Sequence, residues 1–346
     1  MPAKALIAMS GGVDSSVAAV LTLENGYQCM GVTLKLHDAS DTAVNDAREA
    51  AEKLGIPHEA LEFTESFRDE VILPFIESYE EGATPNPCVI CNRRIKFGHL
   101  FSHARQVGCE ILVTGHYAQT EKSGSRWLLK KALDPKKDQS YVLYSLGQDT
   151  LANICFPLGN LSKSEVREIA RARGLASATR QESQDICYIP NGDYGAFMEA
   201  FRGKPYPPGD ILDMDGIVIG RHRGLIRYTL GQRRGLGVAA NLPVYVVAKD
   251  VASNTITLGP ESALYKKTLT ADRINLIACE KLDKPVRVTV KTRYLQQEKP
   301  AWAVQTGPDE IRIDFDEGQR ALTPGQSAVL YDGDVVVGGG IIRSAV

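Results

Sequence analysis

The pattern of hydrophobic and polar positions changes once along the chain. In the first part, short apolar runs alternate with amphipathic segments. Lys4–Met9, Tyr27–Leu36 and Cys109–Ala118 are predicted strands, and Ser15–Asn25 and Asp41–Gly55 are predicted helices. This alternation indicates a parallel sheet covered by helices on both faces. The pattern continues to about residue 203.

After this point the chain becomes rich in predicted strands. The segment Gly203–Gly216 is dense in Pro and Gly, which indicates a domain boundary. Gly216–Gly237 and Leu242–Gly259 are predicted to be short strands joined by turns. From about Thr268 the chain is almost purely β, and Val286–Tyr294 alternates with period two, as a half-buried strand requires. We therefore expect three domains, over residues 1–203, 204–267 and 268–346, the last a small closed or sandwich-like β domain.

Composition excludes several classes of protein. The 346 residues are 43% hydrophobic, which is enough for two or three domains with cores. No segment approaches the roughly 18 consecutive apolar residues of a membrane helix, and the first residues do not resemble a signal peptide. Seven cysteines at irregular spacings are not typical of a secreted disulfide framework. We expect a cytoplasmic protein without membrane contact.

Charge is distributed unevenly, although the net charge is only −2. Residues 38–81 contain 13 acidic and 3 basic side chains, whereas residues 82–109 contain 4 basic and no acidic ones. Residues 202–235 contain 7 Lys or Arg against 3 Asp. Either this is ordinary surface variation, or the basic stretches bind a polyanion along one face.

A glycine-rich loop after the first strand is the clearest candidate for phosphate binding. The strand ends at Met9, Gly11 and Gly12 allow a tight turn, and a helix follows. Backbone N–H groups at a helix N-terminus attract anions. Ser10, Ser15 and Ser16 add hydroxyl donors, and Asp14 could orient Mg²⁺ or cap the helix.

The alternative to phosphate binding at this loop is a plain capped strand–helix turn. The loop lacks the lysine of a kinase-type P-loop and the chain lacks a G-x-G-x-x-G fingerprint, which disfavours γ-phosphoryl transfer and NAD chemistry.

A pair of cysteines, Cys88 and Cys91, is followed by the cations Arg93, Arg94 and Lys96. These cations are expected to lower the thiol pKa and favour a reactive thiolate, and they could also hold phosphates. A zinc site has only one further candidate pair, His99 and His103, at an unusually short spacing. A redox pair lacks its usual context. The nucleophile is the favoured interpretation.

Several motifs occur in order along the chain and together resemble one family. They are SGGVDSS, TPNPCVICNRRIKFG, VTGHYA, KKDQSYVLYSL, FPLGNLSKSEVREIA, SQDICYI, YTLGQRRGLG, PVYVVAKD and LTPGQSAVLYDGDVVVGGGII. The set, from about Lys4 to Ile342, is similar to the bacterial tRNA-specific 2-thiouridylases. The resemblance implies an α/β fold with a Rossmann-like adenine nucleotide α-hydrolase domain, a small central domain and a C-terminal β-barrel.

The resemblance also implies the chemistry. Its reaction is the ATP-dependent exchange of the C2 oxygen of the wobble uridine for sulfur, through adenylation of that oxygen. By motif position, Cys91 matches the nucleophilic cysteine and Cys187 the persulfide-bearing cysteine, and a disulfide bond is implied. Cys88 replaces an Asp of some members. Cys88, Cys91 and Cys187 could instead hold a [4Fe–4S] cluster, which remains an alternative.

The remaining site residues follow from the resemblance, position by position. For ATP and Mg²⁺ they are Ala8, Met9, Ser10, Gly11, Gly12, Val13, Asp14, Ser15, Leu34 and Gly115. For tRNA they are Asn86, Pro87 and Cys88 at the target base, with His116, Lys137, Asp138, Gln139, Arg293, Tyr294 and Gln326 elsewhere. The implied partners are tRNAs that read Glu, Gln and Lys codons and a persulfide donor, either a cysteine desulfurase or a relay protein.

Overall fold

The protein is described by a computed structural model over residues 2–37, 40–179, 186–189, 192–239 and 242–346. The helical segments are α1 (Val13–Glu24), α2 (Asp41–Leu54), α3 (Thr64–Phe67), η2 (Arg68–Ile72), α4 (Leu73–Glu80), α5 (Pro87–Cys91), η3 (Asn92–His99), α6 (Leu100–Gln106), α7 (Ser140–Leu143), α8 (Gln148–Ala152), α9 (Lys163–Ala172), η4 (Ala176–Thr179), α10 (Tyr194–Arg202), η6 (Leu225–Arg227) and η7 (Glu261–Leu264). The strands are β1 (Lys4–Ala8), β2 (Gln28–Lys35), β3 (His58–Glu62), β4 (Ile111–Thr114), β5 (Gln119–Ser123), β6 (Arg126–Lys130), β7 (Ile154–Cys155), β8 (Gly209–Leu212), β9 (Val218–His222), β10 (Tyr245–Asp250), β11 (Thr255–Gly259), β12 (Tyr265–Leu276), β13 (Val286–Lys291), β14 (Lys299–Gly307), β15 (Glu310–Arg320), β16 (Ser327–Asp332) and β17 (Val335–Ala345).

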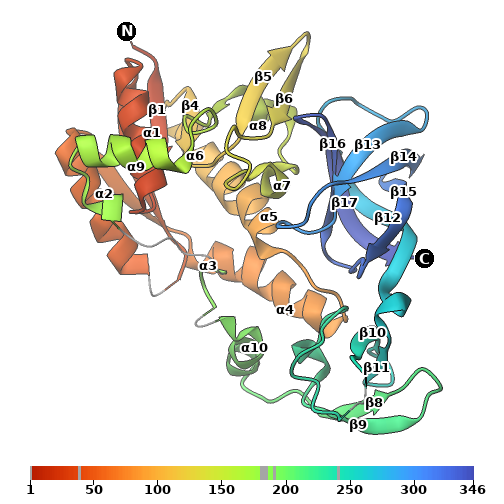
Figure 1. The fold of residues 1–346 in the computed structure, drawn as a ribbon. Coiled ribbons are helices and arrows are strands. Elements are labelled where there is room, and N and C mark those ends of the chain that lie inside the picture. Colours follow the sequence, from red (N-terminus) through yellow and green to blue (C-terminus); the bar gives the residue numbers. More distant parts are fainter. Residues whose placement is uncertain (1, 38–39, 180–185, 190–191, 240–241) are drawn as a thin grey trace.

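The N-terminal part is built on a parallel sheet in the order β3-β2-β1-β4-β7. Successive residues of β1 face opposite sides: Ala5 and Ile7 pack under α1, α2 and α9, whereas Leu6 packs with α6. Helices therefore cover both faces, as the alternating pattern predicts (Figure 1). The strand order reverses between β1 and β4, and ligands of open α/β sheets bind at such a switch point.

The C-terminal part is a closed β-barrel. Its strands follow the order β12-β15-β14-β13-β16-β17, and pairing of β12 with β17 closes the ring. The hairpin β5–β6 belongs to the first half of the chain, yet β6 pairs with β17 at Lys130 and Val335, so it extends the barrel (Figure 1). The sequence pattern does not predict this antiparallel hairpin within the α/β part.

The chain between these parts forms a small sheet in the order β10-β11-β8-β9, which lies below the barrel in the view of Figure 1 and which α10 joins to the N-terminal part. The expected fold class is thus confirmed. The stretch after β9 differs from the prediction of short strands, because residues 223–239 form the single turn η6 followed by irregular backbone. Among the helices of the described segments, none is long and apolar enough to cross a membrane.

Candidate active site

The glycine-rich loop connects β1 to α1. Gly11 has a φ of 73°, and a Cβ there would lie 2.7 Å from Cβ of Asp46 on α2, so only glycine fits this turn. Gly12 is the N-cap of α1 and, as a glycine, has no side chain that could cap the helix. The N-cap residue therefore gives the first N–H groups of α1 no side-chain acceptor, and together with the helix dipole such groups favour an anion.

Hydroxyl groups hold the loop in shape. The backbone N–H of Ser10 donates to Oγ of Ser15 over 3.0 Å, and the hydroxyls of Ser15 and Ser16 both donate to the carbonyl of Gly12. These bonds fix the conformation of the loop without using its first helical N–H groups. The residues predicted to bind ATP from Ala8 to Ser15 thus run from the end of β1 through the turn into the start of α1.

Gly115 follows β4 at the switch point and contacts the same helix. A Cβ at Gly115 would lie 2.7 Å from the backbone N of Ser15 and 2.8 Å from the carbonyl carbon of Asp14. Backbone atoms cannot yield as a side chain can, so the absence of a side chain permits this contact. Leu34, the other predicted ATP residue, is half-buried near the end of β2 and packs against both the sheet core and the cluster around Cys91.

Two residues that the sequence analysis missed complete this loop. Oδ1 of Asp14 accepts hydrogen bonds from Nζ of Lys163 over 2.6 Å and from the hydroxyl of Tyr117 over 2.7 Å. Lys163 is the first residue of α9, which Ser162 and Glu165 cap reciprocally. A lysine at a helix N-terminus opposes the helix dipole. That local conflict was the one signal in the sequence that could have identified Lys163.

The cysteine pair lies at the start of a long bent helix made of α5, η3 and α6. Asn86 caps it by accepting a hydrogen bond from the backbone N–H of Cys88 over 3.1 Å. Cys88 is exposed, whereas Cys91, one turn later, is 9% exposed. The π-helical segment η3 follows at once, and such segments are frequent at functional sites.

Cys187 comes to the same place from a distant part of the chain. It is exposed, and its neighbours Tyr188 and Ile189 are buried in one hydrophobic cluster with Cys91 and Ile95. The first residues of the predicted motif, 183–185, lie outside the described residues. All seven cysteines are free thiols.

Burial dominates the electrostatics of these thiols. It raises the pKa of Cys91 to about 12 and also raises the pKa values of Cys88 and Cys187, which are exposed but lie in a densely packed region. The charge of Lys96 lowers the pKa of all three thiols, but this effect is smaller than that of burial. Lys96 thus acts in the expected direction, but the expected net lowering of the thiol pKa is wrong because burial outweighs it.

His116 follows Gly115 in the sequence and contacts η3, the helical segment that follows Cys91. Its ring lies 5.7 Å from that of Phe97 on η3 and accepts or donates a 2.7 Å hydrogen bond with Thr114, the last residue of β4. Burial and Lys96 hold the pKa of His116 well below its usual value, so the ring is neutral. It is 9% exposed. A contact of this side chain with tRNA stays a prediction.

The predicted tRNA residues 137–139 pack close to the loop. Asp138 is buried and accepts hydrogen bonds from the backbone N–H groups of Ala132 and Ser140. Gln139 is half-buried, and its side chain accepts from the backbone N–H of Tyr117 over 3.0 Å. Lys137 is half-buried as well. Gln139 therefore supports the segment that presents Tyr117 to Asp14, and Asp138 fixes the turn that carries Gln139.

The predicted tRNA residues of the barrel also make internal contacts. Nη2 of Arg293 donates to the carbonyls of Leu230 and Ala321 and to the hydroxyl of Thr323. Gln326 donates to the carbonyl of Thr84 over 2.7 Å, two residues before Asn86. Tyr294 is half-buried, and burial, with smaller contributions from Asp138 and Cys88, raises its pKa. The barrel thereby positions the segment that carries Cys88.

The two histidines considered as zinc ligands, His99 and His103, form ion pairs with glutamates instead. His99 pairs with Glu70 and His103 pairs with Glu59, each through Nε2. These pairs attach the basic helix to the acidic elements η2 and β3. Within the described segments, no three His, Cys, Asp or Glu side chains form a group that could hold a metal ion.

Models of protein families match almost the entire chain. Residues 3–191 match the tRNA methyl transferase HUP domain, residues 196–260 the tRNA methyl transferase PRC-barrel domain, and residues 266–342 the aminomethyltransferase beta-barrel domain.

Curated relatives match over their full length. The tRNA-specific 2-thiouridylase MnmA of Clostridioides difficile is 45% identical, covering 100% of this chain and 99% of its own. The protein of the same name from Acetivibrio thermocellus is 44% identical, covering 98% and 99%. Solved structures are more distant: a 4-thiouridine synthetase–RNA complex with bound ATP is 19% identical, covers 54% of this chain and 44% of that one, and has a TM-score of 0.36.

Proposed function

This chain belongs to the MnmA family of tRNA-specific 2-thiouridylases, and we propose that it replaces the C2 oxygen of the wobble uridine of tRNA by sulfur at the expense of ATP. The observation that carries the proposal is the 45% identity over the whole chain. Two adjacent residues support it: Gly115 lies against the glycine-rich loop, and the ring of His116 contacts Phe97 on η3, the helical segment that follows Cys91.

The residues of the glycine-rich loop fit the polyphosphate of ATP. The uncapped N-terminus of α1 offers N–H donors, and glycines at positions 11, 12 and 115 leave room beside the backbone. Lys163 adds a cation. Asp14 would hold Mg²⁺, which neutralises phosphate charge and makes pyrophosphate a better leaving group.

The C2 oxygen of uridine is a poor leaving group, and adenylation makes it part of a good one, AMP. The C2 oxygen of uridine attacks the α-phosphorus of ATP, pyrophosphate departs, and N3 loses its proton. The oxygen now belongs to an AMP ester, and it leaves with AMP when a nucleophile attacks C2.

Sulfur transfer uses the two cysteines in turn. The terminal sulfur of a persulfide on Cys187 attacks C2 and expels AMP, which leaves a disulfide between Cys187 and the base. The Cys91 thiolate then attacks Sγ of Cys187. A Cys91–Cys187 disulfide forms, and the electron pair of the broken S–S bond leaves with the 2-thiouridine, which regains a proton at N3. A cellular thiol reductant supplies the two electrons that restore both cysteines.

An iron–sulfur cluster on Cys88, Cys91 and Cys187 is the alternative sulfur route. As arranged among the described residues, these three thiols do not form a group that fits a metal, so we derive no step through a cluster. Iron and sulfide analysis after anaerobic purification separates the routes. Cluster-free protein with full activity supports the persulfide route, and activity that follows iron content opposes it.

The proposed partners are tRNAs that read Glu, Gln and Lys codons and a persulfide donor, a cysteine desulfurase or a relay protein. We propose that the enzyme works in the cytoplasm, where these tRNAs are. The names of the matching family models suggest methyl transfer as a second reaction. Methyl transfer has no use for an adenylating loop, and it leaves the C2 oxygen in place.

One experiment tests the function. The pure protein is incubated with ATP, Mg²⁺ and a transcript bearing U34, beside the same transcript with C34. AMP and pyrophosphate formed only with U34 support adenylation of the wobble base. ADP, or AMP formed without tRNA, contradicts the proposal. With a persulfide donor present, mass analysis of the transcript distinguishes exchange of oxygen for sulfur from methylation.

A further inference from the structure

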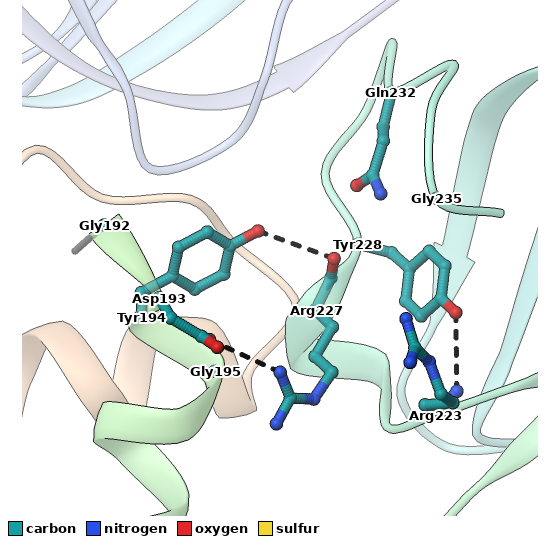
Figure 2. Close-up of a pocket in the computed structure, with 9 residues that line it drawn as sticks. All are labelled: Gly192, Asp193, Tyr194, Gly195, Arg223, Arg227, Tyr228, Gln232 and Gly235. Atoms are coloured by element: carbon teal, nitrogen blue, oxygen red, sulfur yellow. Dashed lines mark hydrogen bonds and ion pairs between the residues drawn. The ribbon is translucent and has the colours of Figure 1, made fainter.

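A cavity lies between the start of α10 and the loop that follows β9. Its volume is about 350 Å³. Its walls come from the chain just beyond Cys187 on one side and from the central domain on the other (Figure 2). Two arginines and two tyrosines line it with polar groups: Arg223, Arg227, Tyr194 and Tyr228.

The two arginines of the cavity differ in their partners. Arg227 donates to Glu199 over 2.7 Å and lies 3.4 Å from Asp193, and its carbonyl accepts from the hydroxyl of Tyr194 (Figure 2). Its charge is thus neutralised within the protein. Arg223 is exposed, and within the described part of the chain no carboxylate pairs with it.

Two more cations lie in the same segment after β9. Arg233 and Arg234 are exposed, and neither forms an ion pair with the residues that the structure describes. Arg233 lines a second hollow of about 270 Å³, which shares Gly235 with the first. The segment 223–239 therefore carries three arginines, Arg223, Arg233 and Arg234, that have no carboxylate partner among the described residues and lie beside two adjoining hollows. We call this segment the arginine loop.

The backbone of this arginine loop is held in place. The side chain of Gln232 accepts from the N–H of Thr229 and donates to the carbonyl of Arg234, each over 3.0 Å. Arg320 of the barrel donates to the carbonyl of Gly231. A loop fixed in this way loses little conformational entropy when it binds a ligand.

The loop is also anchored to the core beneath the thiols. Ile226, between the two cavity arginines, is buried in the same hydrophobic cluster as Cys91 and Tyr188. The ring of Tyr194 stacks on that of Tyr79 at 5.2 Å. The arginine loop and the thiol site are therefore attached to one hydrophobic cluster.

We infer that the arginine loop binds the phosphodiester backbone of the tRNA, with Arg223, Arg233 and Arg234 each contacting phosphate. This inference rests on the proposed function, since it takes tRNA as the substrate. Arginine suits this role because its planar guanidinium contacts phosphate through two N–H groups. Arg227 is excluded from the role by its carboxylate partners and serves to hold α10 against η6.

The test is the salt dependence of tRNA binding to the full-length protein. The variant Arg223→Gln, Arg233→Gln, Arg234→Gln is compared with wild type and with Arg312→Gln, which removes an exposed barrel arginine paired with Asp314. Each lost phosphate contact lowers the slope of log K against log salt by about 0.7 to 0.9. We expect the triple variant to lose about 2 to 3 of that slope and at least about ten-fold in affinity at moderate salt. Unchanged thermal melting of both variants shows that they fold.

The outcomes separate this inference from the proposed function. A slope equal to that of wild type overturns the inference, and so does an equal fall in Arg312→Gln. If the triple variant binds tRNA normally but receives less sulfur from a persulfide donor protein, the loop is a protein docking site and the inference is also overturned. If the slope falls as expected while wild type makes no AMP with U34, the RNA contact stands and the proposed function fails.

Discussion

Lys163 and Asp14 form an ion pair of 2.6 Å across 149 residues of sequence. The pair brings the N-terminus of α9 against the N-terminus of α1, so that the glycine-rich loop has a cation although its own sequence has none. Tyr117 donates to the same carboxylate oxygen. The glycine-rich loop is therefore completed by tertiary structure. In the proposed mechanism, Lys163 would contact phosphate once the carboxylate of Asp14 held Mg²⁺.

Replacing Lys163 by Gln should weaken adenylation. The change removes a charge-assisted partner worth about 1.5–3 kcal/mol, which corresponds to a loss of about 10- to 100-fold in kcat/KM for ATP. Pyrophosphate release with U34 transcript measures it. Arg171→Gln, an exposed cation at the other end of α9, is the matched control. Equal activity of the two variants would remove Lys163 from the nucleotide site.

Replacing Gly115 by Ala should displace the loop. The new Cβ would meet the backbone of Ser15 and Asp14 at less than 3 Å, and overpacking of this kind costs about 1–3 kcal/mol. We expect a lower melting temperature and a loss of pyrophosphate release. Gly147→Ala is the control, because a Cβ there meets nothing within 4 Å. If Gly115→Ala makes AMP at the wild-type rate, the close contact is not needed for adenylation.

The sequence predicted those parts of the molecule that depend on local pattern. Apolar strands alternating with amphipathic helices identified the parallel sheet, and period-two alternation identified the barrel strands. Pairing between distant segments leaves no such pattern: the hairpin β5–β6 joins the barrel where Lys130 pairs with Val335, far apart in the sequence. For the same reason Lys163 was missed. A motif shows which residues occur together, and only the fold shows which of them meet.

Electrostatics were the least predictable part of the site. Three cations following Cys91 in sequence suggested a lowered thiol pKa, but burial raises it to about 12. Arg93 and Arg94 are exposed, and Lys96 is the half-buried member of the three. Proximity in sequence thus overstated the number of charges that act on the thiol. Burial depends on packing from η2, α4 and the segment around Tyr188, which the local sequence cannot reveal.

The reactivity of Cys91 should depend on pH and on Lys96. Because its pKa is about 12, the thiol holds its proton at neutral pH, and its alkylation rate should rise about ten-fold per pH unit between 7 and 10. Lys96→Met removes the cation that lowers this pKa, so alkylation should slow by about three- to ten-fold throughout that range. A pulse of iodoacetamide followed by peptide mass analysis measures the rate.

The neighbouring cation provides the control for this measurement. Arg94 is exposed, so Arg94→Met should leave the alkylation rate of Cys91 within about two-fold of wild type, as expected for a screened surface charge. A similar slowing in both variants would mean that the whole cationic segment acts on the thiol. A rate independent of pH would contradict the raised pKa itself.

Replacing Cys187 and replacing Cys91 should stop the reaction at different steps. Cys187→Ala removes the sulfur carrier, so it should release pyrophosphate with U34 transcript but form no 2-thiouridine. Cys91→Ser leaves the carrier and removes the thiol that resolves it. The disulfide between Cys187 and the base should then persist as a covalent protein–tRNA adduct.

Denaturing electrophoresis tests this difference directly. With ATP, U34 transcript and a persulfide donor, Cys91→Ser should give a shifted band that a thiol reductant converts to free protein and thiolated tRNA. Cys29→Ala is the control, because Cys29 is buried on β2 in the core beneath α1 and α2. It should turn over without a persistent adduct. A shifted band in Cys187→Ala would assign the carrier to another cysteine, and the exposed Cys88 is then the next to replace.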